Sequence, residues 1–155
     1  ALDLACGLGA NSLFLASRGL NVEAWDSSPV ALKRLYGNAE KEGLAHSVCC
    51  RLVDIEQHPP KPDSYNVIVT SYFLYRPICE AIEKALKSNG ILVYQTFHRN
   101  RLSDTGPTNP DFQLEENELL ALFPNLQVRI YIENYQAGDM AVGDRDTALL
   151  IAQKC

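Results

Sequence analysis

The stretch DLACGLGANS at residues 3–12 places two glycines directly after a short apolar run. Gly7 and Gly9 stand one residue apart, between the apolar residues 2–5 and a helical pattern over residues 11–19. Glycine at such a junction permits a tight turn and lets a ligand approach the backbone closely. The stretch therefore predicts an α/β fold with a ligand beyond the carboxyl end of its first strand. The alternative is that the glycines only shape the turn.

Strand and helix patterns alternate along the rest of the chain. Apolar runs predict seven strands, at residues 2–5, 21–26, 48–54, 65–72, 91–97, 127–135 and 147–154. Helical patterns lie between many of them, at residues 11–19, 27–43, 76–90 and 116–123, with Asn11 and Ser28 as expected N-caps. No helix separates the last two strands, so they are expected to pair antiparallel. The order predicts one domain over residues 1–155, with a doubly wound, mostly parallel seven-stranded sheet ending in an antiparallel hairpin.

Composition narrows the class of protein. The chain has 155 residues, of which 46% are hydrophobic and 21% charged, and its formal net charge is −5. An acidic domain repels phosphate backbones, so nucleic acid is not expected as a partner. No apolar run approaches the ~20 residues of a membrane helix, and no signal peptide pattern is present. The five cysteines form no CxxC pair, which favours reduced thiols in a cytoplasmic protein and no metal site.

An acidic residue ends the second predicted strand, next to the glycine turn. The carboxylate of Asp26 at that place can accept two hydrogen bonds from a ribose diol, which predicts an adenosine-type cofactor. A dinucleotide site would carry a third glycine, and Ser12 stands at that position, which argues against a nicotinamide cofactor. A nicotinamide-dependent oxidoreductase and a non-catalytic cofactor-binding module remain as alternatives.

The stretch DLACGLGANS, with Asp26 after it, resembles the first motif of class I S-adenosylmethionine-dependent methyltransferases. The later stretch YQTF…GPTNPDFQLEENELLALF is similar to the small methyltransferases of the tellurite-resistance type. The resemblance implies a Rossmann-like methyltransferase fold, S-adenosylmethionine as cofactor, and methyl transfer to a small-molecule acceptor. Members of the family often carry a helix before the first strand that closes over the cofactor. Because Ala1 already lies at that strand, this cover is expected to be missing.

The resemblance also implies a set of cofactor-binding residues. Asp26 would hold the ribose, Asp54 the adenine with Ile55 against the ring, and Asp3 the methionine end. The full expected set is Asp3, Ala5, Cys6, Gly7, Gly9, Asp26, Ser27, Asp54, Ile55, Thr70, Ser71 and Tyr72. In the alternative interpretation, Asp3 orders the loop, Asp54 caps a strand end, and Thr70 and Ser71 are turn residues. Cys6 is interpreted as a packed side chain and not as a nucleophile.

Two groups of side chains are candidates for handling the acceptor. His98, Arg99 and Arg101 form a basic cluster on the loop at residues 98–111 and are the predicted catalytic residues, recruiting an anionic acceptor with His98 as base. The alternative is a solvated loop. The aromatic residues of SYFLYR at 71–76 are expected to wall the acceptor or, alternatively, to pack in the core.

The acceptor itself is predicted only as a class. A thiol needs no base, whereas a hydroxyl does. No Asn-Pro-Pro-Tyr stretch follows the fourth strand, which argues against methylation of an amide or an exocyclic base amine. The sequence thus favours a thiol, a chalcogen oxyanion or a hydroxyl, with RNA or protein acceptors as an alternative.

Overall fold

The structure is a computed structural model that describes all of residues 1–155. Its elements are β1 (Leu2–Leu4), α1 (Ala10–Ser17), β2 (Val22–Asp26), α2 (Pro29–Lys41), η1 (Ala45–Ser47), β3 (Val48–Leu52), β4 (Tyr65–Ser71), η2 (Arg76–Ile78), α3 (Cys79–Ala85), β5 (Leu86–Phe97), η3 (Pro110–Phe112), α4 (Glu118–Leu122), β6 (Gln127–Ile132) and β7 (Thr147–Gln153). None of the helices is long and apolar enough to cross a membrane.

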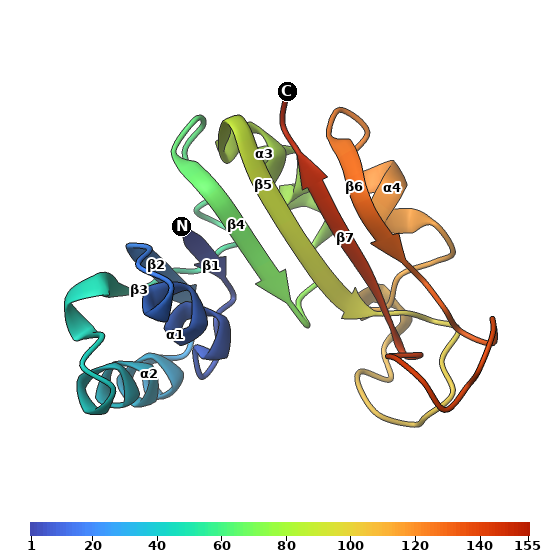
Figure 1. Cartoon of the computed structure of the whole chain (residues 1–155), viewed down its shortest axis with the longest axis horizontal. Helices are drawn as coiled ribbons and strands as arrows, with labels where there is room; N and C mark the ends of the chain where they lie inside the picture. Colours follow the sequence, from blue (N-terminus) through green and yellow to red (C-terminus); the bar gives the residue numbers. More distant parts are fainter.

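The seven strands form one sheet in the order β3-β2-β1-β4-β5-β7-β6. Strands β1 to β5 pair in parallel, and β7 pairs antiparallel with both β5 and β6. In Figure 1, β4 and β5 run downward and β7 returns upward between β5 and β6. The predicted doubly wound, mostly parallel sheet with a C-terminal antiparallel hairpin is therefore confirmed.

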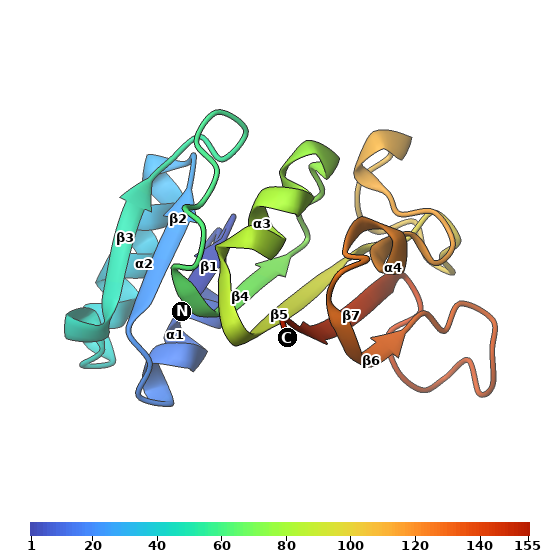
Figure 2. The same cartoon turned by 90° about the horizontal axis from the view of Figure 1, so that it is seen from above.

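Two separate apolar clusters show that the helices cover both faces of the sheet. One cluster joins Val22 and Ala24 of β2 to α1 and α2. The other joins Trp25 of β2 and the leucines of β1 to α3 and α4. Since successive side chains of a strand point to opposite faces, these clusters lie on opposite sides of the sheet. Figure 2 shows α2 beside β2 and β3, and α3 beside β4 and β5.

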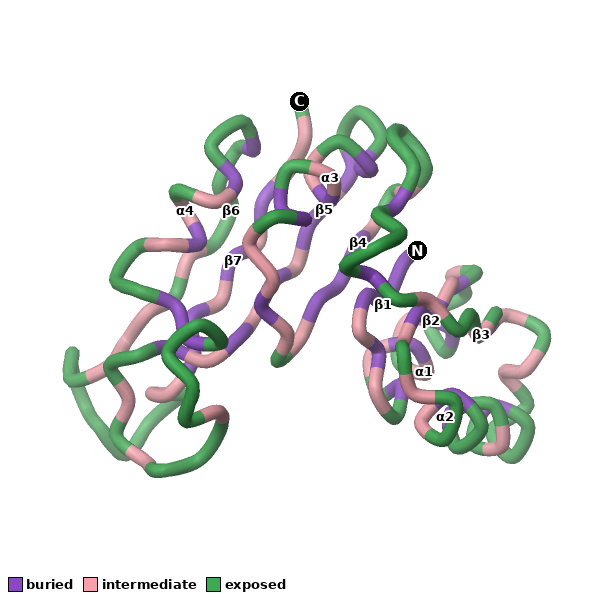
Figure 3. The backbone as a smooth tube through the Cα atoms, turned by 180° about the vertical axis from the view of Figure 1, so that it is seen from behind, coloured by how far each residue is buried: buried purple, intermediate pink, exposed green.

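The two faces are covered to different extents. The row Leu4, Thr70, Tyr94, Leu150 crosses four strands on the side of α3 and α4, and every member is at most 1% exposed. The row on the other side runs Asp3, Val69, Val93, Ile151, Ile130. Exposure along this row rises from 1% at Asp3 to 47% at Ile130, because the contacts of α1 and α2 with the sheet are concentrated on β2 and β3. Figure 3 shows the buried segments concentrated in the strands and the exposed ones in the loops.

The third helix is shorter than the sequence predicts. The helix expected over residues 76–90 ends at Ala85, and β5 begins at Leu86, so the last third of that prediction is wrong. Leu86 pairs with Tyr65 at the start of β4 and is fully buried, and its carbonyl accepts from Lys154 Nζ at 2.6 Å. These partners lie far along the chain, and they override the helical pattern of the segment.

Candidate functional site

The turn between β1 and α1 is built from left-handed residues. Ala5, Gly7 and Gly9 have φ of 57°, 53° and 79°. The Cys6 N–H donates to the carbonyl of Trp25 at 2.9 Å, and the Gly9 N–H donates to the carbonyl of Cys6 at 2.8 Å. The helix begins directly after Gly9, which is its N-cap, so the prediction that Asn11 caps α1 is wrong.

The two glycines of this turn have different surroundings. A Cβ on Gly9 would lie 2.1 Å from Cδ1 of Leu35, a fully buried residue of α2, so this position has no room for a side chain. A Cβ on Gly7 would meet nothing within 4 Å. Gly9 therefore allows the loop to pack closely on α2, whereas Gly7 leaves an open space beside the backbone.

Asp26 connects the glycine turn to the start of α2. Its Oδ2 accepts from the Gly7 N–H at 2.8 Å, and its Oδ1 accepts from the Ser28 N–H at 2.8 Å. Ser28 in turn caps α2, with its Oγ accepting from the Ala31 N–H at 3.2 Å, as the sequence predicts. Each oxygen of a carboxylate can accept more than one hydrogen bond, so Asp26 keeps acceptor capacity for a ligand.

Asp3 lies directly beneath the turn with one oxygen lacking a partner. The side chain is 1% exposed, and its Oδ2 accepts from Ser12 Oγ at 2.6 Å. The other oxygen, Oδ1, has no hydrogen-bond partner. Burial raises the pKa of the Asp3 carboxyl, against the opposing effect of the Ser12 hydrogen bond. Buried carboxylate oxygens are normally satisfied, so Oδ1 marks a place where a ligand or water belongs.

The end of β4 presents Ser71 and Thr70 to opposite faces of the sheet. Ser71 lies on the face of Asp3, and its Oγ accepts from Asn11 Nδ2 of α1 at 3.1 Å. Thr70 lies on the other face beside Leu4, fully buried, with its hydroxyl unpartnered. Of the two residues expected to face the cofactor, only Ser71 has its side chain on the side of the glycine turn.

Asp54 and Ile55 follow β3 on a short turn. Asp54 is exposed, and its Oδ1 accepts from the Glu56 N–H at 3.1 Å. Ile55 is 6% exposed and belongs to the large apolar cluster. The side chain of Asp54 thus caps a turn, and its contact with adenine stays a prediction.

The remaining members of the expected cofactor set lie around the glycine turn and at the end of β4. Ser27 is exposed and Ala5 half-buried. Tyr72 is 60% exposed, has φ of 56°, and donates its N–H to the Gln95 carbonyl at 2.8 Å. Cys6 is buried, and burial raises the pKa of its thiol, with the carboxylates of Asp3 and Asp26 adding to the rise. A thiol that stays protonated fits the interpretation as a packed side chain.

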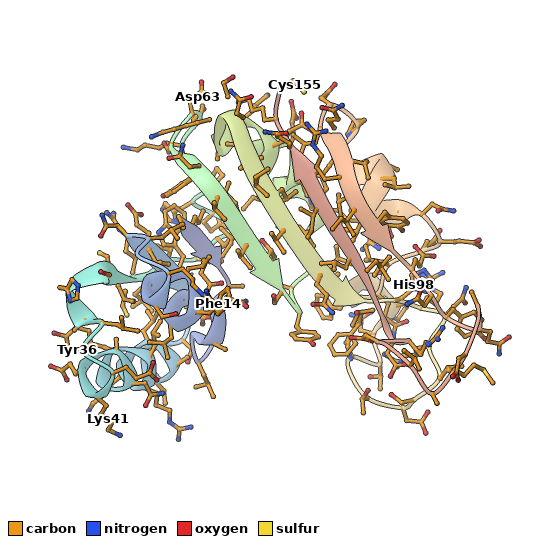
Figure 4. The ribbon with its side chains drawn as sticks, in the orientation of Figure 1. Phe14, Tyr36, Lys41, Asp63, His98 and Cys155 are labelled. Atoms are coloured by element: carbon orange, nitrogen blue, oxygen red, sulfur yellow. The ribbon has the colours of Figure 1, made fainter.

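The three basic residues after β5 each face a partner within the protein. His98 is 2% exposed, and its Nε2 lies 3.0 Å from Oε1 of Glu133, in a close contact that is not aligned as a hydrogen bond. Arg99 Nη1 lies 2.8 Å from Glu115 Oε1, and Arg101 Nη1 donates to the Pro107 carbonyl at 3.0 Å. Figure 4 shows His98 where the long loops gather, far from Phe14 on α1. The three side chains do not converge on a common site.

A second set of contacts, which the sequence did not reveal, holds the loop after β5 in place. Arg76 forms a two-pronged ion pair with Glu118, at 2.5 and 2.9 Å, and donates to the carbonyls of Asp111 and Gln113 at 2.6 and 3.0 Å. The pair raises the pKa of Arg76 and lowers that of Glu118. No local pattern joins Arg76 to Glu118, because they stand on separate elements.

Asp146, just before β7, holds the first part of the same loop. Its Oδ1 accepts from the N–H groups of Leu102 and Ser103 at 2.7 and 3.2 Å, and its Oδ2 accepts from the Ser103 hydroxyl. Its carbonyl accepts from the His98 N–H at 2.8 Å. These hydrogen bonds lower the pKa of the Asp146 carboxyl.

Two cavities lie near these elements. The smaller, of about 200 Å³, opens between the segment after β4 and the loop after β5, with Tyr72, Phe97 and Phe112 in its lining. The larger, of about 740 Å³, is lined by Glu23, Arg51 and the turn after β3. The carboxylate of Glu23 there already accepts from Trp25, Tyr65 and Arg51. Of the candidate residues only Asp54 touches the larger cavity, so its size does not make it the functional site.

Known proteins match this chain along most of its length. The family described as methyltransferase domain matches residues 1–90. A protein of Haemophilus influenzae named "Probable S-adenosyl-L-methionine-dependent methyltransferase TehB" is 30% identical over 139 residues, which cover 86% of this chain and 48% of that protein. The chain thus spans about half the length of the curated relatives it matches.

Solved structures share the fold. The crystal structure of TehB from Haemophilus influenzae has a TM-score of 0.76 at 24% identity, over 99% of this chain and 57% of that one. Geranyl diphosphate C-methyltransferase from Streptomyces coelicolor A3(2), solved with S-adenosyl-L-homocysteine, has a TM-score of 0.77 at 15% identity, over 99% and 70%. At these identities, the likeness concerns the fold alone.

Proposed function

The chain belongs to the methyltransferase domain family, in its class I S-adenosylmethionine-dependent branch, and on this premise we propose that it methylates a small-molecule acceptor. The resemblance predicted from DLACGLGANS is thereby confirmed. S-adenosylmethionine supplies a methyl group that is already electrophilic because it is bonded to a sulfonium. What the protein must add is a binding cleft, an aligned acceptor and the exclusion of water.

The glycine turn is the observation that supports this function. Gly7 leaves open space beside its backbone. Asp26 and Asp3 border the turn, and their carboxylate oxygens can each accept further hydrogen bonds. A carboxylate with free lone pairs suits a ribose diol, and a buried unpartnered carboxylate oxygen suits the ammonium end of a methionine or a bridging water. The chemistry of these residues supports the assignment of the cofactor to this turn.

We assign the cofactor-binding residues along this cleft. Asp26 holds the ribose, Asp3 and Ser71 lie at the methionine end, and Asp54 accepts from the adenine amino group. Asn11, which the sequence predicted only as an N-cap, joins them because its side chain on α1 donates a hydrogen bond to Ser71. Ser12 supports the set from behind, since its hydroxyl orients Asp3.

The acceptor belongs to the thiol, chalcogen oxyanion or hydroxyl class. The catalytic role of His98, Arg99 and Arg101 stays a prediction, and their contacts with Glu133, Glu115 and Pro107 lend it no support. We further place the protein in the cytoplasm, on the strength of its five unpaired cysteines.

Parallel calorimetric titrations with S-adenosylhomocysteine and NAD test the cofactor. We expect saturable binding of S-adenosylhomocysteine and none of NAD. Binding of NAD instead would favour the oxidoreductase alternative. Turnover of labelled S-adenosylmethionine with an acceptor panel separates an enzyme from a non-catalytic module, because a module binds the cofactor and transfers nothing.

A further inference from the structure

The cavity of about 200 Å³ beside Tyr72 has a largely aromatic lining. Four of its seven lining residues are Tyr72, Phe73, Phe97 and Phe112. It opens directly after Ser71, whose side chain bonds Asn11 on the cofactor side of β4. Its volume lies below the ~300–1,000 Å³ of pockets that take drug-sized ligands, so it suits a smaller molecule.

Hydrogen bonds and packing fix one wall of this cavity along β4 and β5. Tyr72 is held by its N–H bond to the Gln95 carbonyl, and its ring lies 5.1 Å from the ring of Phe97. Tyr94 donates its hydroxyl to the Phe73 carbonyl at 2.9 Å. A left-handed, exposed tyrosine is a costly arrangement that the surrounding structure must maintain, and such residues cluster at functional sites.

The loop after β5 supplies the opposite wall. Gly106 packs so closely on Phe97 that a Cβ there would lie 2.6 Å from its ring. The Pro107 carbonyl accepts from Gln113 Nε2 at 2.6 Å and from Arg101 Nη1 at 3.0 Å. Arg101 thus braces the wall of the cavity from outside. These contacts hold both walls in place, which lowers the ordering cost of binding a ligand.

Charge decides what the cavity can take. Glu56 is the one residue with a charged side chain in the lining. Arg99 is directed to Glu115, His98 to Glu133 and Arg101 to the Pro107 carbonyl, and none of the three lines the cavity. An acceptor whose body carries a carboxylate or an oxyanion would lose hydration in a largely aromatic space and meet the repulsion of Glu56.

Resting on the proposed methyl transfer, we propose that this cavity is the acceptor pocket and that it takes a small, uncharged molecule with an apolar body and a thiol. A hydroxyl would need a base, for which the lining offers no imidazole and only the Glu56 carboxylate, whereas a thiol ionises with a pKa of ~8.5 and needs no base. The thiol sulfur forms the new bond to the methyl carbon, the bond from the cofactor sulfur breaks with its electron pair left on that sulfur, and the thiol proton goes to solvent.

Binding of a thioether probe tests the pocket apart from catalysis. Benzyl methyl sulfide and 4-(methylsulfanylmethyl)benzoate differ only in a carboxylate, and ligand-observed NMR gives the Kd of each. We expect the uncharged probe to bind at least tenfold more tightly, and Glu56→Gln to narrow that ratio. Equal or tighter binding of the carboxylate by the parent protein would overturn the assignment.

Two variants locate the probe. Phe97→Ala should weaken benzyl methyl sulfide binding about tenfold, and Phe112→Ala, at an exposed position off the strands, should do so without risk to folding. Phe14→Ala is the matched control, since Phe14 is an exposed aromatic that does not line the cavity. Figure 4 labels Phe14 on α1. If Phe112→Ala and Phe14→Ala leave the Kd equally unchanged, the probe binds elsewhere and the pocket assignment is wrong.

Turnover separates this inference from the proposed function. Benzyl mercaptan, 4-(mercaptomethyl)benzoate, selenite and benzylamine form the panel. Preferred methylation of benzyl mercaptan supports both ideas. Thioether binding without methylation of any acceptor would remove the proposed transfer and leave the pocket. Preferred methylation of selenite or of the carboxylate would keep the proposed function and overturn the pocket, and preferred methylation of benzylamine would overturn the thiol assignment.

Discussion

The glycine turn after β1 and the loop after β5 lie at the same edge of the sheet but use their polar groups in opposite ways. The glycine turn keeps unused hydrogen-bonding capacity, with open space at Gly7 and a buried, unpartnered oxygen on Asp3. The basic residues after β5 instead face acidic partners within the protein, with Arg99 on Glu115 and His98 on Glu133. The difference teaches that a cluster of charged residues in a sequence indicates a binding site only if the folded protein does not pair those residues with groups from other segments.

The largest effect is expected for Gly9→Ala, which tests the close packing of the glycine turn on α2. The variant combines left-handed strain of ~1–2 kcal/mol with overpacking of ~1–3 kcal/mol against buried Leu35, so we expect a loss of roughly 2–5 kcal/mol in the free energy of unfolding. Denaturant titration measures it. Gly19→Ala is the matched control, because Gly19 has φ of 85° but open space where its Cβ would lie. Equal losses in the two variants would show that contact with Leu35 is unimportant.

Arg76→Ala tests whether the ion pair between Arg76 and Glu118 stabilises the loop after β5. The side chains of Arg76 and Glu118 are 34% and 17% exposed, so the pair is intermediate between an exposed and a buried one. Exposed pairs contribute ~0–1 kcal/mol and breaking a buried pair costs ~3–5 kcal/mol. We therefore expect the free energy of unfolding to fall by about 2 kcal/mol at pH 7. Lys84→Ala, which breaks the fully exposed pair with Glu80, is the control and should leave the free energy of unfolding nearly unchanged.

The same pair predicts a pH dependence. Arg76 lowers the pKa of Glu118 below its ordinary value of 4.5, so the stabilisation is fully present above pH 4.5 and is lost as the pH falls through the lower, folded pKa. The difference in unfolding free energy between the parent protein and Arg76→Ala should therefore shrink from pH 7 to pH 3. A difference that stays constant over this range would show that Arg76 acts through its carbonyl contacts and not through Glu118.

Asp26→Ala tests whether the carboxylate beside the glycine turn binds the cofactor. Charge-assisted hydrogen bonds contribute ~1.5–3 kcal/mol each, so loss of the carboxylate should weaken S-adenosylhomocysteine binding tenfold or more in calorimetry. Because Asp26 also holds the Gly7 N–H, amide exchange at Gly7 should be followed in the same variant. Ser28→Ala is the control that removes the cap of α2 and leaves Asp26 in place. Unchanged affinity in a folded Asp26→Ala protein would place the ribose elsewhere.

The smallest expected effect belongs to Arg99→Ala. Arg99 and Glu115 are 48% and 63% exposed, so their pair should contribute less than ~0.5 kcal/mol to stability. The KM for an accepted thiol and its dependence on salt should match those of the parent protein. A KM that rises in the variant and loses its salt dependence would return Arg99 to the role of recruiting an anion.

The sequence was sufficient for those features that the backbone determines locally. The glycine turn, the Ser28 cap with Pro29 after it, and the antiparallel hairpin follow from residue types at fixed positions, and all are present. Asn11 shows where this reasoning fails. Its residue type is typical of an N-cap, but its side chain donates a hydrogen bond to Ser71 on β4 instead.

What the sequence could not give is the partner of each polar side chain. His98, Arg99 and Arg101 were predicted to act together because they are neighbours in the chain. Their partners Glu133 and Glu115 stand on other segments, and only the folded sheet brings them within reach. Thr70 and Ser71 point to opposite faces of the sheet because side chains alternate along a strand, and this alternation could be read from the sequence. The register with Asp3 then shows which of the two lies on the side of the glycine turn.

Asp146 gives the proposed acceptor pocket an unusual dependence on a distant part of the chain. The loop that supplies Pro107 is tied at Leu102 and Ser103 to this one carboxylate, which precedes the last strand. An insertion or deletion in the connection between β6 and β7 would therefore shift the pocket wall without altering any residue that lines it. Substrate preference in related proteins could drift by this route, and a search for specificity determinants confined to lining residues would overlook it.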